Sequence, residues 1–329
     1  MTGDGLQAET EKGGTGMESS ADRSDIRLCR LEDCTFRQAV ELWNAGFSGY
    51  YSDMTTTVEK FAVRLGRESI RPDLSVAAFA GDEPAGFVLV ALKEAGGVKI
   101  AWNGGTGVSP ACRGRGLAKR LMREAVEAMK RGGAELAYLE VVQQNAGAVA
   151  VYESVGFRIV DGLIGAKRTG PVGRYPQADD ENGGKEGYTL SVVKPRELTR
   201  LPFFRFDAAW SGQWFNRAED DGIVVSGVDG KPLAYALVRR AQDEDGALRA
   251  VTLYHCAADP ALGDRRTGPL HAALEAAFGP AEADCARATD NLSMSDPAVV
   301  EWLKAAGFET AYTQYLMKAA FGTERRDLS

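Results

Sequence analysis

Apolar residues in this chain repeat at two spacings, which separate candidate helices from candidate strands. Phe36, Val40, Trp43 and Phe47 recur every three to four residues, which predicts a helix with one apolar face. Short alternating or continuous apolar runs bounded by turn residues predict strands. In the first half the expected strands are 26–28, 75–80, 85–92, 98–108, 136–142, 157–160 and 188–193, and the expected helices are 36–47, 58–66, 117–131 and 146–155.

Glycine and proline mark where these elements end. Residues 81–84 read Gly-Asp-Glu-Pro, which predicts the turn of a hairpin, and Gly132-Gly133 is typical of a helix end. Residues 165–187 carry Pro171, Gly173 and Pro176 and are expected to form a loop. Residues 1–24 are polar and rich in Gly, Ser and Thr, so we expect a disordered tail.

The second half repeats the order of the first. Strands are expected at 223–226, 233–239 and 251–256, and helices at 268–278 and 297–306. Pro110 precedes Gly156 by 46 residues, and Pro260 precedes Gly307 by 47. Chance agreement between common turn residues is the alternative, but the shared element order favours a duplicated fold. The prediction is an α/β class (α+β mixed sheet) of two tandem domains, each a central mixed sheet flanked by helices, with a tail at 1–24 and domains at 25–193 and 194–329.

Composition narrows the function classes. A chain of 329 residues is long enough for about two domains. Its net charge of −7, with both signs interspersed, argues against a nucleic-acid-binding face. The five cysteines are scattered without a CxxC pair and there are two histidines, so no metal site is expected. No long apolar run and no secretory signal are present, which favours a cytoplasmic protein with no membrane contact.

One segment carries a strong chemical signal. Residues 108–118 read Val-Ser-Pro-Ala-Cys-Arg-Gly-Arg-Gly-Leu-Ala, where an expected strand passes through a glycine loop into an expected helix. Free N–H groups at a helix start bind phosphate or pyrophosphate. Alone, such a loop also occurs in RNA-binding segments and in surface turns. A dinucleotide fingerprint is excluded because Lys119 occupies its third glycine position, and no GK[ST] follows.

The segment resembles motif A of the GNAT acetyltransferases, V-x-P-x-x-R-G-x-G-[LI]-[AG]. Motif B of that family is matched further on, by Leu139-Glu140-Val141 and by Asn145, Ala148, Tyr152 and Gly156-Phe157. The resemblance covers about residues 26–193 and implies acetyl-CoA as co-substrate, without a metal. It implies that the pyrophosphate lies on the loop of Arg113, Gly114, Arg115, Gly116, Leu117 and Ala118. It also implies that Thr106, Gly107 and Val108 pair with the pantetheine and offer an oxyanion N–H, and that Asn145 contacts CoA or caps a helix.

The chemistry of acetyl transfer indicates two further roles. An alkyl amine, with a pKa near ~10.4, is mostly protonated at neutral pH. It must lose a proton before it attacks a thioester, directly or through water. Glu140 is the candidate base, against the alternative of a solvated strand residue. Tyr152 occupies the general-acid position of the family and is the candidate donor to the leaving thiolate, against the alternative of a core tyrosine.

The second copy lacks the residues of the phosphate loop and of the acid and base positions. Aligning Pro260 with Pro110 places Gly-Asp-Arg-Arg-Thr-Gly, residues 263–268, at the phosphate loop. Aligning Gly307 with Gly156 places Leu303 at the acid position and Asn291 opposite Glu140. We expect this copy not to bind acetyl-CoA productively but to help shape the acceptor cleft.

The sequence therefore predicts an N-acetyltransferase that works by direct attack in a ternary complex. The alternative is a non-catalytic CoA-binding regulatory or scaffold protein, which would not need Glu140 and Tyr152. The acceptor is expected to be a small-molecule or peptide amine, and the protein a monomer or homodimer. Aromatic residues that could line the acceptor pocket are Trp43, Phe47, Tyr50, Tyr51 and Trp102.

Overall fold

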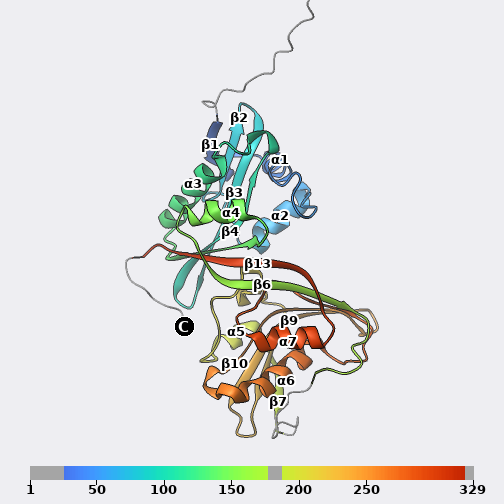
Figure 1. Cartoon of the computed structure of the whole chain (residues 1–329). Coiled ribbons are helices and arrows are strands. Elements are labelled where there is room, and N and C mark those ends of the chain that lie inside the picture. Colours follow the sequence, from blue (N-terminus) through green and yellow to red (C-terminus); the bar gives the residue numbers. More distant parts are fainter. Residues whose placement is uncertain (1–25, 177–186, 323–329) are drawn as a thin grey trace, which may run out of the picture.

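The protein is described here by a computed structural model that covers residues 26–176 and 187–322, so the tail predicted for residues 1–24 lies outside the described part. A single mixed sheet of 13 strands runs through both halves (Figure 1). The first half contributes β1 Ile26–Arg30, β2 Val76–Ala80, β3 Glu83–Ala95, β4 Val98–Val108, β5 Leu136–Val142 and β6 Arg158–Thr169. Its helices are α1 Phe36–Gly46, α2 Val58–Arg67, α3 Leu117–Arg131 and α4 Ala146–Glu153.

The second half repeats this order after a short edge strand. Its strands are β7 Thr189–Val193, β8 Asp221–Ser226, β9 Pro232–Gln242, β10 Leu248–Ala258, β11 Ala286–Thr289, β12 Leu292–Ser293 and β13 Glu309–Ala320. Its helices are α5 Pro195–Leu198, α6 Thr267–Phe278 and α7 Pro297–Ala305, with a one-turn 3-10 segment, η3, at Trp210–Gly212. The predicted α/β class and the tandem arrangement are confirmed.

The two halves exchange their last strands. The sheet order is β1-β2-β3-β4-β5-β13-β6-β11-β10-β9-β8-β7, and the short β12 also pairs with β6. The last strand of the chain, β13, therefore pairs with β5 of the first half, and β6 of the first half pairs with β11 of the second. Both long strands cross the middle of the molecule side by side (Figure 1). The two predicted sheets are thus joined into one.

Each half packs helices on its sheet according to the alternation of strand side chains. In the first half, α3 places Leu121 and Ala125 against one face, together with Leu139 of β5. The α1 helix places Leu42 and Trp43 against the opposite face, together with Tyr138 of β5. Because neighbouring strand residues face opposite ways, Glu140 lies on the face of Tyr138. The sequence alone did not reveal this face.

Three expectations differ from the structure in the region between the halves. β6 continues to Thr169, so the loop predicted from residue 165 begins later. No strand was predicted at the position of β13. β7 pairs with β8, at the far edge of the sheet from the first half. The division at residues 193 and 194 stays a prediction, and strand pairing favours a boundary ahead of Thr189.

Candidate functional site

Strands β4 and β5 run together for a short distance and then separate. They pair in parallel only from Ile100–Trp102 to Leu136–Tyr138. Beyond Trp102, β4 keeps its pairing with β3, but a bulge opposite Leu89 and Val90 interrupts the register. The edge of β4 from Asn103 to Val108 therefore has no strand partner on the β5 side. Unpaired backbone groups along such an edge can hydrogen-bond an extended ligand that carries amides.

The predicted phosphate loop leads into a helix start that no side chain caps. A one-turn 3-10 segment spans Pro110–Cys112, and α3 begins at Leu117 with Gly116 as its N-cap and no side chain capping it. Gly114 and Gly116 have φ of 73° and 77°, a region that favours glycine. A Cβ at either position would contact nothing within 4 Å. These glycines are therefore required by backbone conformation, and they leave open space in front of the helix start.

Some of the predicted cofactor residues line the cavity, and others are packed in the core or exposed to solvent. Those that line the cavity described below are Thr106, Val108, Arg113, Ala118 and Asn145. Gly107 packs against Gly46 of α1, where an added Cβ would come within 2.9 Å of the Gly46 Cα. Leu117 is buried in the core under α3, and Arg115 is exposed.

The guanidinium of Arg113 hydrogen-bonds backbone carbonyls of the protein itself. It donates to the carbonyls of Val108 at 2.9 Å, Ser48 at 2.6 Å and Gly46 at 3.3 Å. It thereby ties the phosphate loop to the end of α1. Asn145 caps α4, since its side chain accepts the N–H of Ala148 at 3.1 Å. The direct CoA contacts predicted for both residues stay predictions.

Tyr152 lies buried at the gap between β4 and β5. Burial raises the pKa of its phenol, and hydrogen bonds with Thr106 and Asn103 act in the opposite direction. Asn103 also donates to Thr106 at 2.9 Å and accepts the N–H of Gly105 at 3.0 Å. The hydroxyl of Tyr152 is thus protonated at neutral pH and is oriented by two polar neighbours from the bulged part of β4.

Glu140 is held by two indole-bearing residues, one from each half. Trp102 Nε1 donates to its Oε2 at 2.6 Å, and the backbone N–H of Trp210 donates to its Oε1 at 2.7 Å. The two indole rings stack with centroids 5.4 Å apart and planes inclined by 6°. Burial raises the pKa of Glu140 to about 7, while the two N–H donors act to lower it and the charge of Asp290 adds to the rise. A carboxyl group with this pKa is close to half ionised at neutral pH, which suits a general base.

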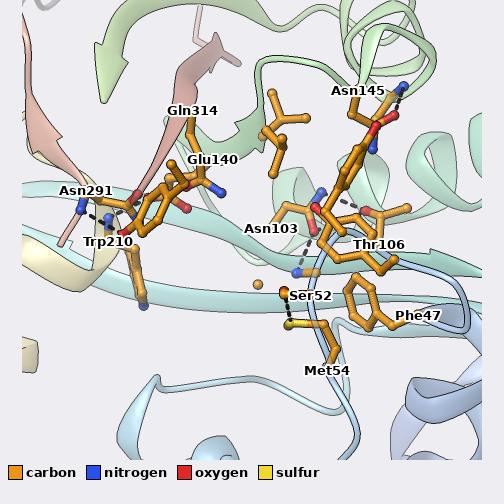
Figure 2. A pocket seen from close by; sticks show the side chains of 18 of the residues that line it. Phe47, Ser52, Met54, Asn103, Thr106, Glu140, Asn145, Trp210, Asn291 and Gln314 are labelled. Atoms are coloured by element: carbon orange, nitrogen blue, oxygen red, sulfur yellow. Dashed lines mark hydrogen bonds between the residues drawn. The ribbon is translucent and has the colours of Figure 1, made fainter. Parts of the chain in front are cut away.

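A cavity of about 1220 Å³ joins these groups. In Figure 2, Glu140, Trp210 and Asn291 lie together, apart from Asn103, Thr106 and Asn145. All five aromatic residues predicted for an acceptor pocket line it, although Trp43 is also almost fully buried in the core. Its walls come from both halves: the second half supplies residues 210, 211, 216, 217, 254, 290, 291 and 311–314.

Strand register corrects one position of the sequence alignment. The bulge of β4 lies at Gly104 and that of β10 at Tyr254, which fixes an offset of 150 residues between these strands. Ile100 pairs with Leu136, and Ala250 pairs with Ala286, so β5 and β11 keep the same offset. Counting one residue beyond the end of β11 at Thr289 places Asp290 at the position of Glu140. The prediction that Asn291 lies there is wrong, because the segment between β11 and α7 is one residue longer than its first-half counterpart and an alignment anchored at Gly307 includes that residue.

The second half fills the space that the first leaves open. By the same offset, Gly104 and Gly105 correspond to Tyr254 and His255. His255 is 2% exposed and packs edge-on against Phe204 and Tyr235, with centroids 5.7 and 5.3 Å away. Burial lowers its pKa to about 4, so it is neutral at physiological pH.

The helix start of the second half also differs from that of the first. Arg266 replaces Gly116 as the N-cap of α6 and forms an ion pair with Asp296 at 3.2 Å. These replacements agree with the expectation that the second copy does not hold acetyl-CoA productively, which stays a prediction.

Sequence reasoning missed three parts of the site: the Trp102–Trp210 stack, the Asn103 contact with Tyr152, and Asp290. Trp102 was considered only as a pocket aromatic, and Trp210 gave no signal because its partners are far away in sequence.

In the described ranges 26–176 and 187–322, no helix is long and apolar enough to span a membrane. The same ranges contain no cluster of three or more His, Cys, Asp or Glu residues suited to a metal ion.

Comparisons with known proteins agree with this geometry. Residues 36–157 match the family model described as "Acetyltransferase (GNAT) family". Over 54 residues the chain is 50% identical to the N-alpha-acetyltransferase RimI of Mycobacterium tuberculosis, a match that covers 16% of this chain and 32% of that relative. The chain therefore matches about a third of the length of this curated relative.

Solved structures resemble nearly the whole chain. A GCN5-related N-acetyltransferase from Sphaerobacter thermophilus has a TM-score of 0.56 at 14% identity, covering 90% of this chain and 96% of that one. A tandem GNAT protein from the clavulanic acid biosynthesis pathway has a TM-score of 0.52 at 15% identity, covering 91% and 100%. At these identities the likeness shows the fold alone. With the motifs, the separated strands and the family match in agreement, residues 36–157 are similar to the GNAT acetyltransferase family.

Proposed function

We propose that the protein is an N-acetyltransferase that transfers an acetyl group from acetyl-CoA to an amine by direct attack. The observation that carries the proposal is that Glu140 and Tyr152 line one cavity beside the unpaired edge of β4. This single cavity supplies a base near neutral pKa, a protonated phenol and free backbone groups.

The residues around the cavity fit acetyl-CoA. The open space at Gly114 and Gly116, in front of the uncapped start of α3, suits a pyrophosphate. The edge of β4 at Thr106, Gly107 and Val108 has no strand partner on the β5 side and suits the amides of the pantetheine arm. When bound, acetyl-CoA would supply the acetyl thioester that the amine attacks.

In the proposed reaction, side chains of the protein transfer the protons and a backbone N–H stabilises the negative charge. The carboxylate of Glu140 accepts a proton from the ammonium form of the acceptor, directly or through water. A backbone N–H of β4 near Thr106 to Val108 stabilises the oxygen that gains negative charge. The hydroxyl of Tyr152 donates its proton to the sulfur of the departing thiolate, and Thr106 and Asn103 orient that hydroxyl.

A thiol-release assay across classes of amines tests the proposal. With the correct amine, the wild-type protein releases free CoA at a rate well above acetyl-CoA hydrolysis. Glu140→Gln and Tyr152→Phe each lower kcat by about 10²–10⁴-fold, the usual worth of a positioned acid or base. If no amine class raised thiol release while CoA still bound, the scaffold alternative would replace this proposal.

The acceptor is proposed to be a small-molecule or peptide amine. The cavity is large and bears aromatic and carboxylate groups from both halves, in keeping with a second copy that shapes the acceptor side. A homodimer is not needed to complete this site, since both walls come from one chain.

A further inference from the structure

One residue of the second half, Trp210, hydrogen-bonds the side chain of the proposed base. Trp210 lies in η3, on the connection between β7 and β8, and is 2% exposed. Its backbone N–H, not its side chain, donates to Glu140 Oε1 at 2.7 Å. The other carboxylate oxygen accepts from Trp102 Nε1 of the first half. Each oxygen of the carboxylate is therefore fixed by a donor from a different half of the molecule.

Trp210 is itself held from several sides. Its indole Nε1 donates to the carbonyl of Glu68 at 3.1 Å, next to the end of α2. Its own carbonyl accepts from Asn216 Nδ2 at 2.7 Å. Its ring stacks on Trp102, with centroids 5.4 Å apart. A donor fixed in this way does not need to reorganise when the carboxylate charges, which is how preorganised dipoles act in catalysis.

We propose that Trp210 and Trp102 form a two-point clamp that positions the carboxylate of Glu140 and keeps it ionisable inside the cavity, so that the second half is part of the catalytic unit. The inference rests on the proposed role of Glu140 as base. A carboxylate offers about four lone-pair sites, and the clamp occupies one on each oxygen. A remaining site can accept a proton from the amine that takes up the acetyl group.

The clamp opposes the other influences on this carboxylate. Burial and the charge of Asp290 raise the pKa of Glu140, whereas the two N–H donors lower it. Tyr312 of β13 is the titratable neighbour whose own pKa is raised in part by Glu140. Other titratable and charged groups on the cavity wall are Arg64, Arg67 and Glu68 of α2 and its end, Tyr50, Tyr51, Arg113 and Tyr152 on the proposed CoA side, and Arg217 and Tyr254 from the second half.

Trp102→Phe tests one point of the clamp. It keeps an aromatic ring against Trp210 and removes the Nε1–H donor. Loss of a hydrogen bond to a charged group raises the pKa of the carboxyl by about one unit. We expect the acid limb of the pH profile of kcat/KM to move up by about one pH unit. Activity then falls about tenfold below the limb and recovers at high pH, a recovery that loss of packing alone would not produce.

Trp210→Pro and Trp210→Ala separate the backbone donor from the indole. Both remove the ring, but only proline removes the N–H. Proline is tolerated in the first turn of a helix, and Ala209 before it is already extended at φ −52° and ψ 151°. We expect the acid limb of Trp210→Pro to lie about one pH unit above that of Trp210→Ala, with equal melting temperatures for the two variants. If the proline variant unfolds, the Trp102→Phe profile and the fluorescence titration below decide.

Tryptophan fluorescence gives a readout that does not depend on turnover. Ionisation of Glu140 beside two stacked indoles should produce a transition near pH 7 in the wild-type protein, absent in Glu140→Gln and shifted upward in Trp102→Phe. Full activity in Glu140→Gln would contradict the proposed function itself. An inactive Glu140→Gln, together with a wild-type acid limb and fluorescence midpoint in Trp102→Phe, would overturn the clamp and leave the proposed function standing.

Discussion

Glu140 and Asp290 occupy the same register position in the two halves, yet their surroundings differ. Two N–H donors hold Glu140, and burial raises its pKa to about 7. Asp290 accepts a hydrogen bond from Tyr312 at 2.7 Å and has neither indole partner. Similarly, Tyr152 of the first half corresponds to Leu303, and Gly116 to Arg266. The two halves thus share the sheet arrangement but differ at each of these positions, and the second half supplies part of the wall of the cavity that contains Glu140 and Tyr152.

Because the two halves exchange strands, truncation should have the largest effect. Ending the chain after Val193 removes β13, which pairs along the whole of β5 from Leu136 to Val142. The exposed edge and the uncovered apolar side chains favour aggregation. We expect an insoluble or unfolded product by circular dichroism, whereas a chain ending at Gly322 stays folded. A soluble, cooperatively melting fragment 26–193 would show that the halves are independent.

The fold was predictable where local signals agree. The bounds predicted for α3, Leu117–Arg131, are those of the structure, because an amphipathic repeat is closed by glycines at both ends. β13 was missed because its partners, β5 and β6, lie about 150 to 180 residues earlier, and its outer residues 309–312 are exposed. The second Gly-Phe pair, Gly307-Phe308, was nevertheless a usable signal, since Gly156-Phe157 precedes β6 in the first half.

The site was predictable in its motifs but not in its long-range contacts. Tyr152 and Glu140 were found because motif spacing is local in sequence. The role of Trp210 was not, because its N–H meets a residue 70 positions away. Arg113 looked like a phosphate ligand by composition, yet it binds backbone carbonyls 65 and 67 residues earlier. Sequence pattern gives residue type and spacing, and tertiary packing decides which partner a polar group receives.

The ionisation of Glu140 should leave a mark on stability, the second largest effect. Its folded pKa of about 7 lies above the ordinary value of 4.5. Its contribution to stability is therefore fully present below about pH 4.5 and is lost as pH rises through 7. The difference in unfolding free energy between wild type and Glu140→Gln should change by about 3 kcal/mol between pH 4.5 and pH 8, measured by urea denaturation. Parallel stability curves would show that Glu140 titrates normally.

Gly116 and Arg266 form a matched pair at the two helix starts. Gly116 has φ of 77°, and its alanine variant must strain or reshape the loop at a cost of about 1–2 kcal/mol. We expect Gly116→Ala to raise the Kd for CoA about tenfold, measured by calorimetry. Arg266→Ala removes an ion pair with Asp296 and should leave CoA affinity unchanged. An equal loss in both variants would mean that the second copy also binds CoA.

Asp290→Asn should have the smallest effect, and it addresses the comparison between the halves directly. The amide oxygen of the new side chain can still accept the hydroxyl of Tyr312, so the local structure is kept while one negative charge is removed. Because that charge raises the pKa of Glu140, its loss should lower the pKa and move the acid limb of kcat/KM down by about half a pH unit. Asp284→Asn, an exposed change just before β11, is the control and should leave the limb in place. Burial and the two N–H donors each influence the pKa of Glu140 more than Asp290 does. If Asp290→Asn shifted the acid limb down as far as Trp102→Phe shifts it up, the second half would control the base mainly through charge. No shift would mean that it does so through the backbone of Trp210 alone.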